Sequence, residues 1–221
     1  MSNELHDRGF AAFLFDMDGT VIDSIAAANR IWARWATRHG LDPAEVLAAI
    51  HGVRAVDTIR RFAPPGTDVE LEAEQLTQAE IDDVEGVVEV PGARRFLDSL
   101  PPDRWAIVTS APRDLARRRM SAAGVPMPAV LVTAADVQRG KPFPDGFVAA
   151  AAALGVPVAD CLIWEDSPAG IAAAEASGGS VVVVSATHAE PTLTRHPTIE
   201  DYESLVVDVD PDGQLRVRRL S

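Results

Sequence analysis

Short, continuous apolar runs recur along the chain, and each one ends abruptly in polar residues. The runs occupy residues 10–15, 105–108, 130–132, 161–164 and 181–184. A run of this length that is apolar at nearly every position is typical of a strand buried on both faces of a parallel sheet. The pattern therefore predicts five strands in the interior of a sheet.

Ala-rich stretches with apolar residues at helical spacing lie between these runs. They cover residues 113–123, 145–154 and 168–176. Strands that alternate with helices imply βαβ units, whose crossovers are right-handed in nearly all proteins. We therefore predict the α/β class, with a doubly wound parallel sheet that carries helices on both faces.

The alternation is interrupted once, after the first predicted strand. Residues 23–90 contain no convincing strand. Their pattern predicts four helices, at residues 25–39, 43–50, 54–62 and 68–85. A further helix at residues 93–100 leads to the second strand. We interpret residues 23–90 as an all-helical cap domain, inserted into an α/β core domain that comprises residues 1–22 and 91–221.

The last segment of the chain follows a different pattern. Residues 205–210 and 214–219 alternate between apolar and polar side chains on either side of Pro211-Asp212-Gly213. Alternation around such turn residues predicts a β-hairpin. We expect this C-terminal β-hairpin to add antiparallel strands at an edge of the sheet.

Composition narrows the possible partners. The 221 residues carry a net charge of −13, which disfavours nucleic acid and anionic membranes as partners, and the basic run at residues 117–119 is interpreted as a solvated helix face. A single cysteine, Cys161, excludes an internal disulfide. Residues 1–8 lack the features of a signal peptide, and no apolar stretch approaches the ~20 residues that span a bilayer. We expect a cytoplasmic protein without nucleic-acid or membrane partners, either a monomer or a homodimer.

Two carboxylates follow the first predicted strand. They are Asp16 and Asp18, and Gly19 then lets the chain turn. Ligands of an open α/β sheet bind at the carboxyl ends of its strands, where we expect these residues. Carboxylates this close repel each other unless a cation or a shared proton intervenes. A hard divalent cation with oxygen ligands, Mg²⁺, resolves the repulsion, although a polar turn that caps a helix would use the same residues.

The other predicted strands end in residues of complementary chemistry. Thr109 and Ser110 follow the second strand and precede a helix, an arrangement that suits an anion. Lys141 lies on a turn after the third strand, and Glu165 and Asp166 follow the fourth. Because parallel strands bring these ends to one edge of the sheet, the sequence predicts a joint site for phosphate and metal.

These motifs, in this order, resemble those of the haloacid dehalogenase superfamily over residues 10–205. The first motif is Asp16-Met17-Asp18-Gly19-Thr20, and Thr109, Lys141 and the Glu165-Asp166 pair correspond to the others. A helical insert directly after the first motif is the type-I cap arrangement of that superfamily. The chain looks most similar to sugar-phosphate and polyol-phosphate phosphatases of the 2-deoxyglucose-6-phosphatase and glycerol-phosphatase type. The shared features are His51-Gly52-Val53-Arg54, Phe62-Ala63-Pro64, Val90-Pro91-Gly92-Ala93, Val108-Thr109-Ser110 and Gly140-Lys141-Pro142.

The resemblance implies roles for the acidic residues. Asp16 is the implied nucleophile, which forms an aspartyl-phosphate and so divides one difficult step into two. Asp18 is the implied general acid for the leaving oxygen, and then the general base for water. Mg²⁺ is the implied cofactor, held by Asp16, the backbone carbonyl of Asp18 and Asp166. Glu165 is a further candidate ligand.

The resemblance also implies residues that bind the substrate. Lys141 and Thr109, with Ser110, are implied to bind the phosphoryl oxygens. Ser110 could instead cap the next helix. In the cap, Arg54 and His51 are candidate contacts to the substrate, although Arg54 could equally be a solvated helix end.

Several related functions compete with this prediction. A dehalogenase would lack the second acid, which is present as Asp18, and a phosphonatase needs a cap lysine, which residues 23–90 do not contain. A β-phosphoglucomutase-like mutase carries a cap histidine where this chain has Ala28, which weakens that alternative without eliminating it. A non-catalytic binding module on the same fold also stays open. We predict a Mg²⁺-dependent phosphatase of small phosphorylated sugars or polyols.

Overall fold

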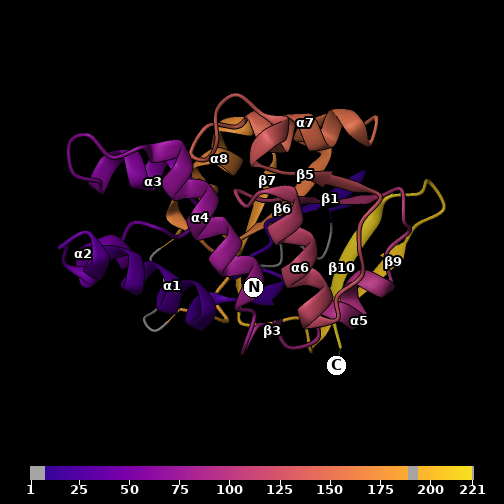
Figure 1. The fold of residues 1–221 in the computed structure, drawn as a ribbon. Helices are drawn as coiled ribbons and strands as arrows, with labels where there is room; N and C mark the ends of the chain where they lie inside the picture. Colours follow the sequence, from indigo (N-terminus) through magenta and orange to yellow (C-terminus); the bar gives the residue numbers. More distant parts are fainter. Residues whose placement is uncertain (1–7, 189–193, 221) are drawn as a thin grey trace.

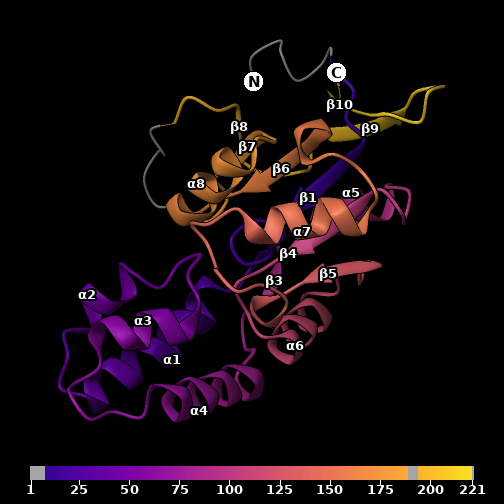
Figure 2. The same cartoon turned by 90° about the horizontal axis from the view of Figure 1, so that it is seen from above.

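Six parallel strands form the central sheet. A computed structural model describes residues 8–188 and 194–220 of the chain. The strand order is β5-β4-β1-β6-β7-β8 (Figures 1 and 2; all six strands are labelled in Figure 2). The strands are β1 (Ala12–Phe15), β4 (Trp105–Val108), β5 (Val130–Val132), β6 (Cys161–Glu165), β7 (Ser180–Val184) and β8 (Thr198–Ile199). All five predicted strands are confirmed, whereas the two-residue edge strand β8 is too short to leave a pattern in the sequence.

Alternate side chains of β1 point to opposite faces of the sheet and so define two hydrophobic layers. The helices of these layers are α5 (Ala93–Asp98), α6 (Arg113–Ala123), α7 (Asp145–Ala153) and α8 (Pro168–Ser177). Phe13 and Phe15 pack in the layer that contains Phe96 of α5. Leu14 packs in the other layer, with Phe147 of α7. Helices therefore cover both faces, and the doubly wound α/β prediction is confirmed (Figure 1).

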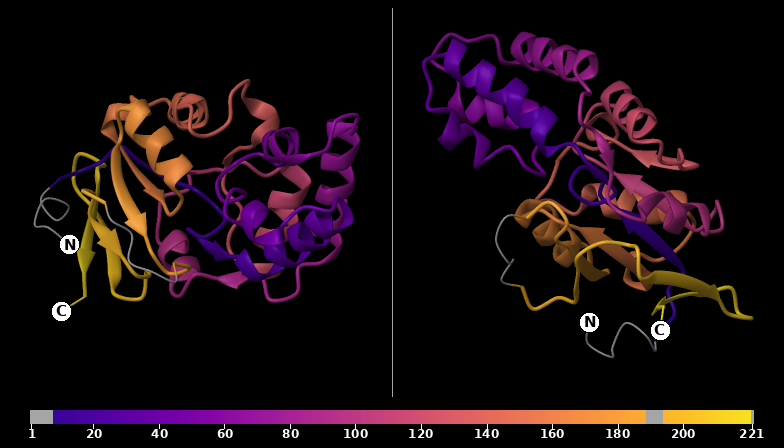
Figure 3. Two further views of the ribbon diagram at one scale, coloured as in Figure 1. Left: turned by 90° about the vertical axis from the view of Figure 1, so that its left-hand side faces the viewer. Right: turned by 90° about the horizontal axis from the view of Figure 1, so that it is seen from below.

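A helical segment lies beside the sheet (Figures 2 and 3). It consists of α1 (Ile25–Arg38), α2 (Pro43–Leu47), α3 (Ala55–Phe62) and α4 (Val69–Asp82). These helices surround a hydrophobic cluster of their own, which includes Trp32, Trp35 and Ile59. The side chains of Asp42 and Asp68 accept backbone hydrogen bonds at the starts of α2 and α4. The four predicted helices are confirmed, and each begins within one residue of its predicted start.

A short ribbon closes the base of the helical segment. β2 (Ile22–Asp23) pairs antiparallel with β3 (Val88–Glu89), which brings the two ends of the segment together. The prediction that residues 23–90 contain no strand is therefore wrong for β3. Its two residues are too few to show a period, and they form a strand only through their partner. The division into a cap of residues 23–90 and a core stays a prediction.

The C-terminal hairpin is present, but it does not extend the central sheet. Among the described residues, β9 (Leu205–Val209) and β10 (Leu215–Arg219) form a separate sheet that is linked to the chain near β1 by one bridge, from Phe10 to Leu215. Leu215 and Val217 are buried in the same layer as Phe13. The prediction that the hairpin adds strands to an edge of the central sheet is therefore wrong. Its position is decided by the burial of these apolar side chains against a face of the sheet.

The sequence predicts no segment that spans a bilayer, and the length and hydropathy of the helices test this prediction. Within the described ranges, no helix is both long enough and apolar enough to cross a bilayer. Residues 1–7, on which the prediction of no signal peptide depends, lie outside the described residues.

Candidate active site

Asp16 and Asp18 lie in a tight turn directly after β1. The backbone N–H of Asp16 donates to the carbonyl of Trp164 at 2.9 Å, which ties the turn to β6. Gly19 has a φ of +87°, and a Cβ at this position would lie 2.1 Å from Oδ2 of Asp166. Only glycine fits here, because it adopts the left-handed conformation readily and leaves room for the carboxylate. The turn thus joins the ends of β1 and β6 in one site.

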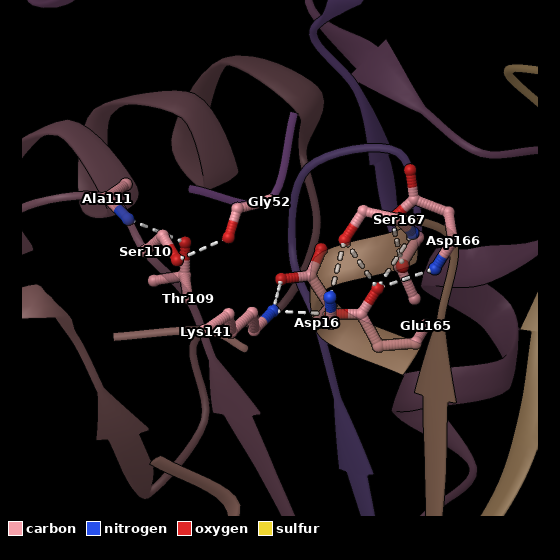
Figure 4. Close-up of polar contacts among 11 residues, drawn as sticks. Asp16, Gly52, Thr109, Ser110, Ala111, Lys141, Glu165, Asp166 and Ser167 are labelled. Carbon is pink, nitrogen blue, oxygen red and sulfur yellow. Dashed lines mark hydrogen bonds and ion pairs between the residues drawn. The ribbon is translucent and has the colours of Figure 1, made fainter. Parts of the chain in front are cut away.

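The end of β6 holds Glu165 in a fixed orientation. This residue is fully buried, and its Oε2 accepts hydrogen bonds from the backbone N–H groups of Asp166 and Ser167 at 2.8 and 2.9 Å. The hydroxyl of Ser167 donates to the same oxygen at 3.1 Å (Figure 4). Gly170 lets the start of α8 approach this carboxylate, since a Cβ there would lie 1.6 Å from Oε1. The donors at the start of a helix favour the negative charge.

Lys141, the only lysine of the chain, links the two strand ends. Its Nζ forms ion pairs with Asp16 and with Glu165, the latter at 2.6 Å (Figure 4). The three side chains are at most 6% exposed. A compact ammonium group can contact both carboxylates in this space, which a planar guanidinium group would not match.

Burial shifts the titration of these groups. Burial raises the pKa of Asp16 to about 7, against the opposing attraction of Lys141. Burial, reinforced by the charges of Glu165 and Asp16, also raises the pKa of Asp166 well above its usual range. Burial alone would lower the pKa of Lys141, but the carboxylates of Asp16 and Glu165 outweigh it and raise that pKa. The site therefore concentrates more negative charge than one ammonium group balances.

Three buried carboxylates converge at this edge of the sheet. Asp16, Glu165 and Asp166 each present an oxygen within 4.8 Å of the others. Thr20 orients Asp166, because its Oγ1 donates to Oδ1 of that residue at 3.0 Å. Hard divalent cations prefer oxygen ligands, and a cation would stabilise the ionised form of these carboxylates. The donor set therefore fits a divalent metal ion.

Thr109 and Ser110 lie where β4 ends. Oγ1 of Thr109 accepts a hydrogen bond from the backbone N–H of Ala111 at 3.0 Å. The hydroxyl of Ser110 donates to the carbonyl of Gly52 in the helical segment at 2.9 Å (Figure 4). The N-cap of α6 is Pro112, so the alternative prediction that Ser110 caps this helix is wrong.

A cavity of about 80 Å³ separates the strand ends from the helical segment. Predicted site residues in its lining are Asp16, Asp18, Thr109, Ser110 and His51. Arg54 does not line it. The Nε of Arg54 pairs with Asp57 at 2.6 Å, and its Nη1 donates to the carbonyl of Gln138 at 3.1 Å. The structure thus brings His51 to the cavity of Asp16 and Asp18, whereas Arg54 lines a neighbouring cavity with Thr109, Ser110 and Lys141.

The structure also places residues at Asp18 that the sequence analysis did not assign to the site. Ser24 and Arg119 both donate to Oδ1 of Asp18, at 2.5 and 3.0 Å. Arg119 forms a second ion pair with Glu80 of α4, at 3.0 Å. Burial raises the pKa of Glu80 to about 7, although Arg119 opposes the shift.

The buried position of Arg119 corrects one interpretation of the sequence. A solvated face was expected for residues 117–119, but Arg119 is 5% exposed. It lies on the buried face of α6, four residues after Leu115, and α4 packs against this helix. The helical spacing from Leu115 is the signal that could have found it.

Comparison with known proteins decides the family. Residues 10–178 match the haloacid dehalogenase-like hydrolases. The chain belongs to this family. Hexitol phosphatase A from Escherichia coli, a relative of this hydrolase, is 40% identical over 211 residues, which cover 93% of this chain and 98% of the relative. Glycerol-1-phosphate phosphohydrolase 2 from Saccharomyces cerevisiae is 33% identical over 187 residues, which cover 80% of this chain and 75% of that protein.

Solved structures share the fold of this hydrolase. β-Phosphoglucomutase from Clostridium difficile gives a TM-score of 0.75 at 18% identity, over 87% of this chain and 91% of that one. At this identity the likeness concerns the fold alone. The family expected from the motifs at the strand ends is confirmed.

Proposed function

We propose that the protein is a divalent-cation-dependent phosphatase that hydrolyses small phosphorylated sugars or polyols. The observation that carries the proposal is the buried cluster of Asp16, Lys141, Glu165 and Asp166 beside a cavity that Asp18 also lines. Burial of charged groups is unfavourable unless they pair with opposite charges or bind a metal ion. Clusters of buried titratable groups with shifted pKa values are concentrated at functional sites. The relatives named hexitol phosphatase and glycerol-1-phosphate phosphohydrolase support the substrate class.

In the proposed first step, a carboxylate oxygen of Asp16 attacks the phosphorus atom of the ester. The bond from phosphorus to the leaving oxygen breaks, and the phosphoryl group becomes an acyl phosphate on Asp16. Asp18 gives its proton to the leaving oxygen, so that the sugar or polyol departs as an alcohol. Both aspartates line the same cavity, which supports this division of roles.

In the proposed second step, water releases the phosphate from Asp16. Asp18 takes a proton from the water molecule as its oxygen attacks phosphorus, and the carboxylate of Asp16 is restored. Lys141 and Thr109, with Ser110, are the proposed ligands of the phosphoryl oxygens. Contacts to Asp16 and Glu165 hold the ammonium group of Lys141 in place. A positive charge that is already in position stabilises the negative charge that develops in the transition state without reorganisation. These contacts therefore support the role of Lys141 as a ligand of the phosphoryl oxygens.

We infer that the cation is Mg²⁺ and that Asp16, Asp166 and the backbone carbonyl of Asp18 hold it. When bound, it would neutralise charge on the transferred phosphoryl group. Glu165 is better suited to orient the site than to ligate the metal directly. Its Oε2 already accepts three hydrogen bonds at the start of α8, and its Oε1 pairs with Lys141.

A phosphomutase is the nearest competing function. A mutase must also hold and activate a second hydroxyl group of the sugar, for which the resemblance implies a cap histidine. Ala28 occupies that position and lines the cavity, where it offers no group that could carry a proton. This supports hydrolysis as the proposed reaction. A non-catalytic binding module would not require both Asp16 and Asp18.

We also propose that residues 23–90 act as a cap over the substrate and exclude water from the site. Hydrogen bonds from Ser110 to Gly52 and from Arg54 to Gln138, which join the helical segment to the strand ends, support this role. A cytoplasmic location is the further proposal, in keeping with the buried free thiol of Cys161. Sedimentation of the purified protein distinguishes a monomer from a homodimer.

The test of the proposed function is phosphate release from a panel of sugar, polyol and nucleotide monophosphates. Each ester is assayed with Mg²⁺ and with EDTA, beside the Asp16→Asn variant. We expect release to be highest on hexitol, hexose or glycerol phosphates and to be lost with EDTA or in the variant. Isomerisation of β-glucose 1-phosphate without phosphate release would favour the mutase. If neither phosphate release nor isomerisation is detected, the result would favour the non-catalytic binding module.

A further inference from the structure

We propose that Arg119 is a positioning residue for Asp18, and that Glu80 of the helical segment holds Arg119 in place. The inference rests on the proposed phosphatase function, because it concerns the group that protonates the leaving oxygen. It gives the helical segment a part in the chemistry in addition to covering the site.

One guanidinium group connects Asp18 to the helical segment. Nη1 of Arg119 donates to Oδ1 of Asp18 at 3.0 Å, and Nη2 donates to Oε1 of Glu80 at 3.0 Å. The side chains of Arg119 and Glu80 are each 7% exposed. The donors of a guanidinium group form a rigid, planar fork, so the position of one carboxylate constrains the other.

The contacts to Asp18 fix which of its oxygens faces the cavity. The hydroxyl of Ser24 donates to Oδ1 at 2.5 Å, and Arg119 donates to the same atom. In the described part of the chain, both of these contacts engage Oδ1, which leaves Oδ2 to meet the leaving oxygen. Proton transfer requires a short and aligned contact, so a residue that sets this orientation affects the rate.

The burial of the Arg119–Glu80 pair points to a role beyond stability. A buried ion pair typically stabilises a fold no more than apolar side chains of similar volume. Both residues line the cavity together with Asp18 and Trp32. Because Glu80 engages the second arm of the guanidinium group, Arg119 is held between two carboxyl groups and not by Asp18 alone.

The arrangement also links the position of Asp18 to the position of the helical segment. Arg119 belongs to α6, which packs on the central sheet, whereas Glu80 belongs to α4. The pair forms only when α4 lies against α6. The orientation of Asp18 therefore depends on the helical segment being closed over the strand ends.

Leaving-group dependence separates a positioning role from a merely structural one. An alkoxide needs a proton to depart, whereas p-nitrophenolate departs readily without one, and kcat/KM covers the steps up to departure. We expect Arg119→Met to lower kcat/KM for sorbitol 6-phosphate by about 10²-fold. We expect the same variant to lower kcat/KM for p-nitrophenyl phosphate by less than about threefold. Asp18→Asn should give the same selective loss and serves as the reference.

Arg118→Met is the matched control. The Nε of Arg118 donates to the carbonyl of Ile81 in α4 at 3.3 Å, so this variant also removes a bond between α6 and the helical segment. It does not contact Asp18, and we expect both esters to be hydrolysed as by the wild type. Arg119→Lys keeps the charge without the planar fork and should restore only part of the activity on sorbitol 6-phosphate.

The experiment distinguishes failure of the positioning role from failure of the proposed function. An equal loss on both esters in Arg119→Met, or a selective loss in Arg118→Met, would overturn the positioning role. If Arg119→Met does not fold, the double variant Arg119→Met/Glu80→Gln removes both charges and carries the same comparison. Failure of the wild type to release phosphate from any ester of the sugar and polyol panel would overturn the proposed function itself.

Discussion

The strand ends and the helical segment form opposite walls of one cavity, but they are built differently. At the strand ends the functional groups are neighbours in sequence, such as Asp16 and Asp18, and backbone hydrogen bonds hold Glu165. In the helical segment, His51 lies in a loop and Glu80 on α4, and both reach the cavity through the packing of helices. Local geometry places the side chains of the first wall, although Arg119 also orients Asp18, and tertiary contacts place those of the second.

This difference separates the chemistry of the proposed enzyme from its substrate preference. Groups fixed by the ends of buried strands are suited to chemistry, which tolerates little displacement. A wall that belongs to a separate hydrophobic cluster, around Trp32 and Ile59, can change its side chains without disturbing the sheet. The helical segment is therefore where we expect substrate preference to be determined.

The strand ends should show the largest effect of any single substitution. We expect Asp16→Asn to lower kcat by roughly 10⁴-fold or more, because an amide cannot replace the carboxylate as a nucleophile. Phosphate release measures the loss, and unfolding in urea checks that the variant is folded. Activity within tenfold of the wild type, on the order of 1.4 kcal/mol in the barrier, would remove Asp16 from the mechanism.

The next effect concerns the charge balance of the same wall. Lys141→Met leaves the buried carboxylates of Asp16 and Glu165 without their cation, and we expect the unfolding free energy of the metal-free protein to fall by roughly 3–5 kcal/mol. Mg²⁺ should recover part of this loss, because it binds only the folded state. A loss below about 1 kcal/mol would contradict a paired, ionised cluster. Denaturant unfolding with EDTA and with Mg²⁺ gives both values.

A smaller effect is expected from pH. The folded-state pKa of Asp16, about 7, exceeds its usual value of 3.8, so the folded protein binds this proton more tightly than the unfolded chain. The stability from this group is present at low pH and is lost as the pH rises towards 7. We expect this group alone to lower the unfolding free energy in EDTA by about 2 kcal/mol between about pH 5 and 7, and Glu80, whose pKa is also raised to about 7, to add to the fall.

Mg²⁺ is the control for this pH dependence. A divalent cation binds the ionised carboxylates and competes with protons, so saturating Mg²⁺ should flatten or reverse the slope. Asp16→Asn removes one of the groups with a raised pKa and should reduce the slope in EDTA by the contribution of that group. An unfolding free energy that rises steadily with pH in EDTA would contradict the raised pKa of Asp16.

The smallest effect tests the helical wall. His51 lines the cavity and Arg54 does not, so we expect His51→Ala to raise KM for sorbitol 6-phosphate roughly tenfold. Arg54→Ala should change KM by less than about threefold, because the hydrogen bonds that it removes go to Asp57 and Gln138 and not to the cavity of Asp16 and Asp18. Steady-state kinetics on the same ester measure both variants. The opposite ranking would show that the substrate approaches from the Arg54 side.

The local pattern of the sequence was sufficient for most of the fold. Helix α6 occupies residues 113–123 as predicted, and the apolar runs became buried strands. The ribbon of β2 and β3 and the placement of the C-terminal hairpin were not predictable in this way. Two residues cannot show a period, and the location of a hairpin depends on which apolar surface it covers.

The same division applies to the candidate site. The sequence by itself determined the family, the sheet and the residues at the strand ends, because chain direction in a parallel sheet brings those ends to one edge. Only the tertiary structure decided that Arg119 meets Asp18 and Glu80, and that His51 rather than Arg54 reaches the cavity. Those contacts join residues far apart in the chain through the packing of α4 against α6, and no periodic pattern encodes the partner of a buried charge.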